Sequence, residues 1–482
     1  MSEPITFKIR PYDWQLACIQ RTEHMDNFAI FAEQGTGKTC ALINAYRLKC
    51  KKRNRLLRTL VLAPLVTLKN WRREFEAHSH INRREMIILK GTSKQKEKLF
   101  RDGTANGRKN KIIITNYETV ISKTVGPLLL DYAPEFLCLD EAHYVKSHNS
   151  KRSKAIANIA DRALFKFLLT GTPILNDVSD LFMPFRIMDG GKTFGNNFYV
   201  FRSKYMMDKN QAWAHSQNHF PKYVSNPDKM EELNTKIYDK AVRVLKKDCL
   251  DLPPLIRQQM AVPMSPEQAK AYKEMHRDFV TFVNEQSGKP QAVVAQLAIT
   301  KALRLQQIVT GYVLDEDGKV YEFKKNPRLD LVEELLGQII QEHKVILWCS
   351  FKHNYKQLGD LCTKMGIPHV FLTGDQSLDQ KDESIQSFEN SPKTRVIIAN
   401  RRAGGIGVNL VAASYSIVYS RNFSLGEELQ SEARNYRGGS QVHEKIVKID
   451  ICAEETVDEA ITTALASKQD ISDRVIDLIK GQ

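Results

Sequence analysis

The sequence predicts an α/β protein with two lobes, each built on a doubly wound parallel sheet and each carrying helical insertions. Three observations lead to this fold class. The chain has 482 residues, of which 42% are hydrophobic, so it can bury more than one core. Short apolar runs recur in two separate series. Between the two series lies a segment of different composition, with helical periodicity and many aromatic residues.

Each apolar run is almost continuously hydrophobic, as expected of strands that are buried on both faces of a parallel sheet. The first series comprises Phe28–Glu33, Thr59–Pro64, Met86–Gly91, Lys111–Asn116, Phe136–Glu141 and Phe165–Thr172. The second series comprises Val345–Ser350, His369–Gly374, Arg395–Asn400, Tyr415–Ser420 and Lys445–Ile451. Because helical or loop segments separate the runs, both series predict parallel strands joined by crossovers.

The composition between and after these series sets the expected boundaries. We expect a first lobe over residues 1–245, with a helical insertion near 174–245. A second lobe is expected over residues 246–482, with a helical insertion near 255–325. Apolar residues spaced along Glu454–Ile479 predict one or two closing amphipathic helices near 454–480.

The composition also excludes several classes of protein. No window approaches the run of about 18 apolar residues that a membrane span needs. We therefore expect a soluble protein without a membrane partner. No secretory signal is visible at the N-terminus. Eight cysteines form no C-x-x-C pair, which argues against a structural metal and a disulfide framework. A reducing compartment, such as the cytoplasm of a bacterial or phage-infected cell, fits best.

The chain is basic, and the excess charge has a place. It contains 71 Lys and Arg against 56 Asp and Glu, which gives a net charge of +15. Residues 1–250 hold 43 basic and 25 acidic residues, or +18, whereas residues 251–482 hold 28 and 31, or −3. The densest part, Arg47–Arg58, has seven basic residues and no acidic one. Such a run is usually a solvated surface, so alone it does not identify a polyanion site.

The first predicted strand leads directly into a glycine loop that is typical of phosphate binding. The loop and its flank are Ala32, Glu33, Gln34, Gly35, Thr36, Gly37, Lys38 and Thr39, and an apolar helical pattern follows. Backbone N–H groups of such a loop can cradle phosphates at a helix N-terminus, while Lys38 reaches the β and γ phosphates and Thr39 binds Mg²⁺. The segment therefore predicts an ATP site with magnesium.

A second strand end supplies the complementary acidic groups. Phe136–Leu139 is followed by Asp140, Glu141, Ala142 and His143. A carboxylate at this place can hold Mg²⁺ through water, which is the role expected of Asp140, and Glu141 can act as general base for the attacking water. Two acidic residues could instead cap the next helix, but a phosphate loop on another strand of the same sheet favours catalysis.

At this point the order of the motifs resembles superfamily-two helicase-like ATPases and, within them, Swi/Snf-related DNA translocases. The likeness runs from Arg10 to about Gln441 and implies two RecA-like lobes. The matching segments are Arg10-Pro11-Tyr12 with Gln15, Leu62-Ala63-Pro64, Thr115–Glu118, Asp140–His143, Leu169–Ile174, Val345–Phe351, Leu372–Gly374, Arg402–Leu410 and Gln430–Gln441. By this resemblance Gln15 reads the adenine of ATP.

The resemblance also assigns residues to DNA and to the transferring phosphoryl group. The strand-end loops would hold one DNA strand through Lys69, Asn70, Trp71, Thr115, Asn116 and Tyr117 in the first lobe and Lys352, Thr373, Gly404 and Gly405 in the second. Arg434 and Arg437 are three residues apart, which would place both on one face of a helix. They resemble the arginine fingers that stabilise charge on the γ-phosphate.

The function expected from these motifs is ATP-driven translocation on duplex DNA. One alternative is a helicase that migrates branches, regresses forks or unwinds RNA, and another is a nucleic-acid-binding subunit with a vestigial ATPase. Where many chromatin remodellers carry Asp before Trp-Asn-Pro, this chain has Ser420-Arg421-Asn422-Phe423-Ser424, so a compact motor is favoured. We expect the first lobe to make the more salt-sensitive contact with DNA, and charge reversal of Lys51, Lys52 and Arg53 would test whether the densest basic run takes part.

Overall fold

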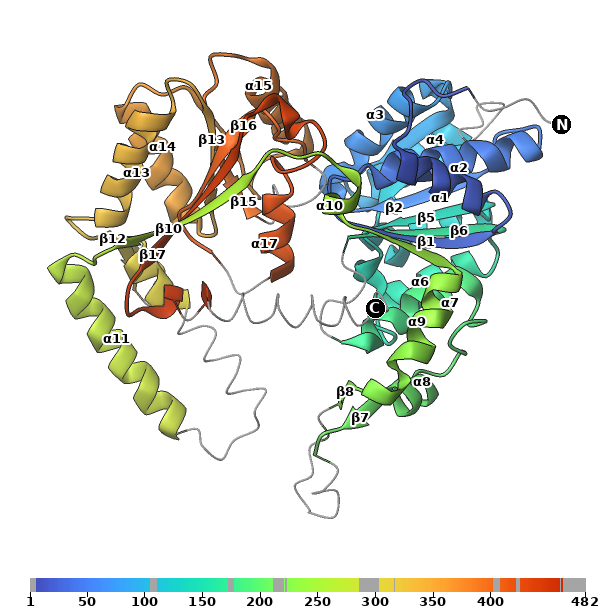
Figure 1. Cartoon of the computed structure of the whole chain (residues 1–482), viewed down its shortest axis with the longest axis horizontal. Coiled ribbons are helices and arrows are strands. Elements are labelled where there is room, and N and C mark those ends of the chain that lie inside the picture. The colour runs from blue at the N-terminus through green and yellow to red at the C-terminus, as the bar shows by residue number, and fades with distance from the viewer. Residues whose placement is uncertain are drawn as a thin grey trace. The chain divides into compact units, whose positions relative to one another are not determined.

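The structure is a computed structural model, and it divides into two compact units, with the first ending at Asp251 and the second beginning at Leu252 (Figure 1). It describes residues 6–104, 111–171, 177–210, 221, 223–285, 303–315, 317–401, 408–421, 425–459 and 461–462. Each unit contains a parallel sheet with helices on both faces, which confirms the predicted fold class. The predicted closing helices near 454–480 lie largely outside the described residues.

The first sheet has seven strands in the order β3-β4-β2-β5-β6-β1-β9, all parallel. The strands are β1 (Asn27–Ala32), β2 (Thr59–Ala63), β3 (Met86–Leu89), β4 (Ile112–Asn116), β5 (Phe136–Asp140), β6 (Phe165–Thr170) and β9 (Ala241–Val244). The helices are α1 (Asp13–Thr22), α2 (Lys38–Lys52), α3 (Leu68–His78), α4 (Ser93–Thr104), α5 (Val125–Tyr132), α6 (Lys151–Ala160), α7 (Phe182–Asp189), α8 (Phe198–Tyr205), α9 (Met230–Asp239) and α10 (Lys246–Cys249).

Side-chain alternation along each strand builds two cores in this unit. In β1, Phe28 and Ile30 pack with α2 and α3, whereas Ala29 and Phe31 pack with α6, α7 and α9. Both sets are buried, which is why the sequence of β1 is continuously apolar rather than alternating. The hairpin of β7 (Met206–Asp208) and β8 (Tyr223–Ser225) extends from α8.

The second sheet has six parallel strands in the order β10-β17-β16-β13-β15-β14. The strands are β10 (Leu255–Val262), β13 (Lys344–Cys349), β14 (His369–Leu372), β15 (Val396–Asn400), β16 (Ala413–Val418) and β17 (Ile446–Ala453). The helices are α11 (Pro266–Glu285), α13 (Pro327–Ile339), α14 (Lys352–Lys364), α15 (Leu378–Asn390) and α17 (Leu425–Glu432). A small hairpin joins β11 (Tyr312–Leu314) and β12 (Val320–Glu322).

Two edge strands, β9 and β10, are absent from the sequence prediction. Strand β9 has only four residues, and two of them are half-buried. Strand β10 is longer, but most of its residues are exposed or half-buried because it has a neighbour on one side only. Neither segment therefore shows the continuous apolar run that revealed the central strands.

The central position of β13 predicts how stability is distributed in the second unit. Ile346 is fully buried in β13, whereas Ile256 on the edge strand β10 is 37% exposed. We expect Ile346→Ala to lower the free energy of unfolding of this unit by about 3 kcal/mol, through lost burial and a cavity. The matched change Ile256→Ala should cost less than about 1 kcal/mol. Urea unfolding compares the two variants, and equal losses would contradict the assigned burial.

Candidate functional site

The glycine loop after β1 has the geometry of a phosphate cradle. Gly35 and Gly37 have φ angles of 85° and 87°, in the left-handed region that glycine adopts without strain. Thr36 is fully buried, and its hydroxyl donates to the carbonyl of Glu33 at 2.7 Å, which fixes the loop. Lys38 and Thr39 follow in the first turn of α2, so the loop ends at a helix N-terminus where anions are favoured.

Gln15 on α1 is tied to this loop by its side-chain amide. Its Nε2 donates to the Gly37 carbonyl at 2.9 Å, and its Oε1 accepts from the Tyr12 backbone N–H at 2.8 Å. A Cβ atom at residue 37 would come within 2.4 Å of Gln15 Nε2, so a side chain there would displace the Gln15 amide from the loop. Gln15 thus supports the loop, and its contact with adenine stays a prediction.

The remaining loop residues pack against the neighbouring strand ends. A Glu33 Oε2 atom accepts from the backbone N–H of Lys246, at 2.7 Å, where the chain leaves β9. Gln34 packs beside Gly171, whose added Cβ would lie 3.2 Å from Gln34 Cγ and 3.5 Å from the Ala32 carbonyl oxygen. The loop is therefore held between the ends of β9 and β6, on either side of β1.

The two predicted acidic residues lie at the carboxyl end of β5, beside Lys38. Lys38 Nζ is 3.6 Å from Glu141 Oε1, and His143 Nδ1 is 3.4 Å from Glu141 Oε2. Glu141 has a φ angle of 55°, which is uncommon for a residue with a side chain and carries backbone strain. Strain of this kind is typical of residues that a site holds in one orientation. The structure thus brings together Lys38, Asp140 and Glu141.

Asp140 is buried, and the protein holds it from two directions. Trp71 Nε1 donates to Asp140 Oδ2 at 2.8 Å, and the Tyr117 hydroxyl donates to the Asp140 carbonyl at 2.7 Å. Burial and the neighbouring Glu141 charge raise the pKa of Asp140 to about 6, although Lys38 and the Trp71 hydrogen bond oppose this. A buried carboxylate with so little positive charge around it fits a site for a cation.

Several residues predicted to contact nucleic acid have a different position. Trp71, Thr115 and Tyr117 are at most 1% exposed, so their side chains cannot lie on a DNA surface, and that prediction is corrected to a supporting role. Thr115 donates to the Thr119 hydroxyl at 2.8 Å. Lys96, a buried lysine whose Nζ donates to Asn116 Oδ1 at 2.6 Å, was not predicted, because no motif in the sequence marks it.

The other predicted nucleic-acid residues differ in exposure. Lys69 and Asn70 are half-buried in the first turns of α3. The Lys352 side chain is 79% exposed at the start of α14 and pairs with Asp375 at 2.8 Å. Thr373 is 6% exposed, and its backbone N–H donates to Gln376 at 2.9 Å. Gly404 and Gly405 lie outside the described residues.

Arg434 and Arg437 come together, but in a turn rather than on a helix. Helix α17 ends at Glu432, and both arginines follow in irregular backbone, so the predicted helical placement is wrong. The Nη1 atoms of both arginines donate to the carbonyl of Val408, at 3.3 and 3.4 Å. Arg434 is only 3% exposed, and the next residue, Asn435, donates to the carbonyl of Ala413 at the start of β16.

The densest basic run, Arg47–Arg58, lies far from the glycine loop. It begins within α2 and ends where β2 starts, so it marks the amino edge of the sheet, about 20 Å along the helix from Lys38. Many of its members bind within the lobe. Lys52 donates to the Glu23 carbonyl at 2.9 Å, and Arg55 donates to Glu135 at 2.8 Å. The expectation that this run holds DNA is therefore not supported.

Membrane-spanning helices and metal-binding clusters were sought among the helices and side chains of the described residues. None of these helices combines the length and apolar character needed to cross a membrane. Within the same ranges, no group of three or more His, Cys, Asp or Glu side chains is placed to bind a metal ion.

The raised pKa of Asp140 predicts a stability that changes with pH. Since its pKa is higher in the folded than in the unfolded protein, ionisation destabilises the fold, fully above pH 6 and less as the pH falls toward 4. A rise from 3.8 to about 6 corresponds to about 3 kcal/mol. We expect Asp140→Asn to stabilise the protein by up to that amount at pH 7.5, and by much less at pH 4.5.

Urea unfolding without nucleotide or magnesium measures this effect. The control is Asp131→Asn, which removes an exposed carboxylate of the same lobe and should change stability by less than about 0.5 kcal/mol at both pH values. A gain from Asp140→Asn that is independent of pH would show that the carboxylate is not strained by burial.

Comparisons with known proteins identify relatives of this chain. The chain is 24% identical over 477 residues to the chromodomain-helicase-DNA-binding protein 1-like of Mus musculus, covering 98% of this chain and 50% of that protein. It is 25% identical over 444 residues to the uncharacterized ATP-dependent helicase MG018 of Mycoplasma genitalium, covering 91% and 39%. The chain thus spans half the length, or less, of these relatives.

A similar solved structure is the SWI2/SNF2 ATPase core of Sulfolobus solfataricus in complex with double-stranded DNA, with 24% identity, a TM-score of 0.45 and coverage of 100% of this chain and 95% of that one. The family model of the SNF2-related domain matches residues 13–311, and that of the helicase conserved C-terminal domain matches residues 327–439. Since the first match alone covers more than half of the sequence, the chain belongs to the SNF2-related family of superfamily-two, ATP-dependent helicase-like enzymes.

Proposed function

We propose that this chain couples the hydrolysis of Mg-ATP to movement along nucleic acid, and that its track is duplex DNA. The observation that carries the proposal is the arrangement at the carboxyl edge of the first sheet. There a buried carboxylate, Asp140, a strained Glu141 and the cation of Lys38 lie together beside a glycine loop. These are the groups that phosphoryl transfer to water requires.

Each of these residues has a role in the proposed reaction. Lys38, which pairs with Glu141 in this structure, would turn to the β and γ phosphates of ATP. Magnesium, held by Thr39 and through water by Asp140, would neutralise charge on the phosphates. Glu141 would accept the proton of the attacking water. Arg434 and Arg437 would place positive charge on the transferring phosphoryl group.

Two observations support DNA as the track. One relative is named as a helicase and DNA-binding protein, and the chain itself carries a net charge of +15. Lys69 and Asn70 at the start of α3, and Lys352 at the start of α14, offer polar side chains just after strand ends. Such contacts would go to phosphates, so binding should tolerate any sequence and weaken with salt.

The proposed location is a reducing compartment such as the cytoplasm. All eight cysteines are free thiols, and seven of them are buried. Their distribution through the hydrophobic cores is that of small apolar residues.

The role of Glu141 predicts a specific loss of turnover. We expect Glu141→Gln to lower the kcat of ATP hydrolysis by at least about 100-fold, because general-base catalysis is lost, while ATP still binds. The matched control is Glu135→Gln, which changes another buried glutamate of this lobe that pairs with Arg55 at the amino edge. It should leave kcat within about twofold. A steady-state ATPase assay with saturating duplex DNA measures both variants.

The same assay separates the proposed function from its alternatives. The ATPase rate is titrated with duplex DNA, single-stranded DNA, a four-way junction and RNA at fixed salt. Strongest stimulation by duplex DNA without strand separation supports a translocase. Unwinding of plain duplex, or stimulation by RNA alone, would replace it with a helicase. If the unaltered chain and Glu141→Gln are equally inactive, the ATPase is vestigial.

The positions of the basic residues predict which of them bind DNA. We expect Lys69→Glu and Lys352→Glu each to weaken duplex binding by about tenfold at moderate salt, and to reduce its salt dependence by about one ion. The matched change Lys51→Glu, on an exposed lysine at the far end of α2, should alter the Kd by less than about twofold. Fluorescence anisotropy over a range of salt concentrations measures all three. A large effect of Lys51→Glu alone would restore the basic run as the DNA surface.

A further inference from the structure

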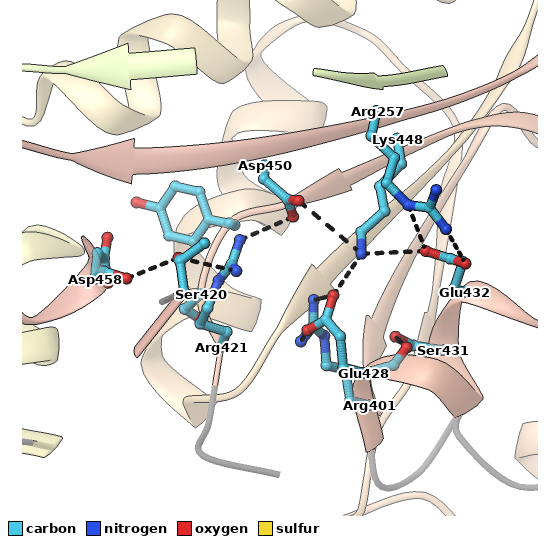
Figure 2. Close-up of polar contacts among 12 residues, drawn as sticks. Arg257, Arg401, Ser420, Arg421, Glu428, Ser431, Glu432, Lys448, Asp450 and Asp458 are labelled. Carbon is cyan, nitrogen blue, oxygen red and sulfur yellow. Dashed lines mark hydrogen bonds and ion pairs between the residues drawn. The ribbon is translucent and has the colours of Figure 1, made fainter. Parts of the chain in front are cut away.

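A cluster of charged side chains, most of them buried, lies between helix α17 and strands β10 and β17 of the second sheet (Figure 2). We call it the charge cluster, and it consists of Arg257, Arg401, Arg421, Glu428, Glu432, Lys448 and Asp450. Arg401 is 1% exposed and Lys448 is 7% exposed, so these groups have left water almost completely. None of the cluster belongs to the residues assigned above to ATP or DNA.

Glu428 and Lys448 form the centre of the cluster. Lys448 Nζ lies 2.5 Å from Glu428 Oε1, 3.5 Å from Glu432 Oε2 and 4.0 Å from Asp450 Oδ2. Glu428 and Glu432 are one helical turn apart on α17, so both carboxylates point to the same side of the helix. Arg257, which is opposite Lys448 in the β10–β17 register, binds Glu432 at 2.7 Å. The sheet thus holds the helix at two successive turns.

Two arginines at strand ends complete the cluster. Arg401 directly follows β15, and its guanidinium binds both oxygens of Glu428. Arg421 lies just beyond β16 and binds Asp450 Oδ1 at 2.8 Å. Burial alone would raise the pKa of Glu428, but the charges of Arg401, Lys448 and Arg421 hold it well below its usual range. Glu428 is therefore ionised at neutral pH.

Stability alone does not account for so many buried charges. Taking charges out of water costs several kcal/mol per ion, and apolar side chains of similar volume often replace buried ion pairs without loss. What a bidentate and multiply paired carboxylate adds is a defined position and orientation. The charge cluster is therefore expected to hold a part of the second unit in one position.

Two arginines follow directly after the end of α17. Glu432 is the last residue of the helix, and Arg434 and Arg437 follow at once in the turn in which both bind the Val408 carbonyl. We propose that Glu428 is a positioning residue for ATP hydrolysis, because it fixes α17 against Arg401 and Lys448 and thereby fixes Arg434 and Arg437. The proposal rests on the function proposed above for these two arginines.

The first test separates positioning from folding. Glu428→Gln keeps the shape of the side chain but leaves Arg401 and Lys448 facing each other without its charge. We expect kcat to fall by about tenfold or more while the KM for ATP stays within about threefold, since Lys38 and Thr39 lie on the other unit. As a control, Asp189→Asn breaks the comparably buried Lys240–Asp189 pair, which lies in the first unit just before β9. It should lower the Tm but not kcat.

The second test is a double-mutant cycle. If Glu428 acts through the arginines, Glu428→Gln should lower kcat less than twofold in a chain that already carries Arg434→Ala and Arg437→Ala. A full additional loss in that background would overturn the proposal. If the two arginine substitutions by themselves leave kcat unchanged, it is the proposed function of the arginines that fails. The two failures are therefore distinguishable.

A second variant covers the case in which Glu428→Gln does not fold. Combining it with Lys448→Met removes a charge of each sign, so fewer buried charges are left unpaired. This double variant should fold, as judged by its Tm, and still show the lowered kcat because α17 has lost its central contact. A folded double variant with the kcat of the unaltered chain would also overturn the proposal.

Discussion

The buried carboxylate of Asp140 is the group on which the arrangement of the first lobe depends. It lies at the end of β5, one strand away from the end of β1, so the parallel order β5-β6-β1 brings it close to Lys38. Trp71 binds one of its oxygens and Tyr117 binds its carbonyl. These large aromatic residues exclude water from one side of the carboxylate. The environment of Asp140 therefore disfavours its ionised form. A bound cation would stabilise that form.

In a parallel sheet all strands run in the same direction, and this direction decides at which edge each loop and helix end lies. All strands of a lobe end at the same edge, so the glycine loop, the acidic pair and Thr170 lie along one edge although they are far apart in sequence. The same geometry sends the end of α2 to the opposite edge, and with it the basic run Arg47–Arg58. The net charge therefore indicates that a polyanion is a suitable partner. The direction of the strands decides which basic side chains lie at the edge of the sheet that carries the glycine loop.

Much of the fold and part of the candidate site could be predicted from the sequence. Central strands are apolar on both faces, and the loop from Gly35 to Thr39 is defined by local spacing, so both were visible. The burial of Trp71, Thr115 and Tyr117 was not, because it depends on contacts with Asp140 and with other side chains distant in sequence. The turn that carries Arg434 and Arg437 was predicted as helix, because a spacing of three residues is compatible with a helix as well as with a turn. The edge strands β9 and β10 lack the apolar run that marks central strands.

Ser420 and Arg421, which lie just beyond β16, both bind other residues of the second lobe. Arg421 is buried, and it compensates Asp450 within the charge cluster, while the Ser420 hydroxyl donates to Asn354 at 2.9 Å. The pKa values of two buried carboxylates, one in each lobe, are therefore shifted in opposite directions. Burial raises the pKa of Asp140 because few cations surround it, whereas three cations hold the pKa of Glu428 low. An undercompensated carboxylate can still gain from a ligand, but a fully compensated one cannot. This difference is what we expect if Asp140 helps to hold Mg²⁺ and Glu428 holds other residues in place, as proposed above.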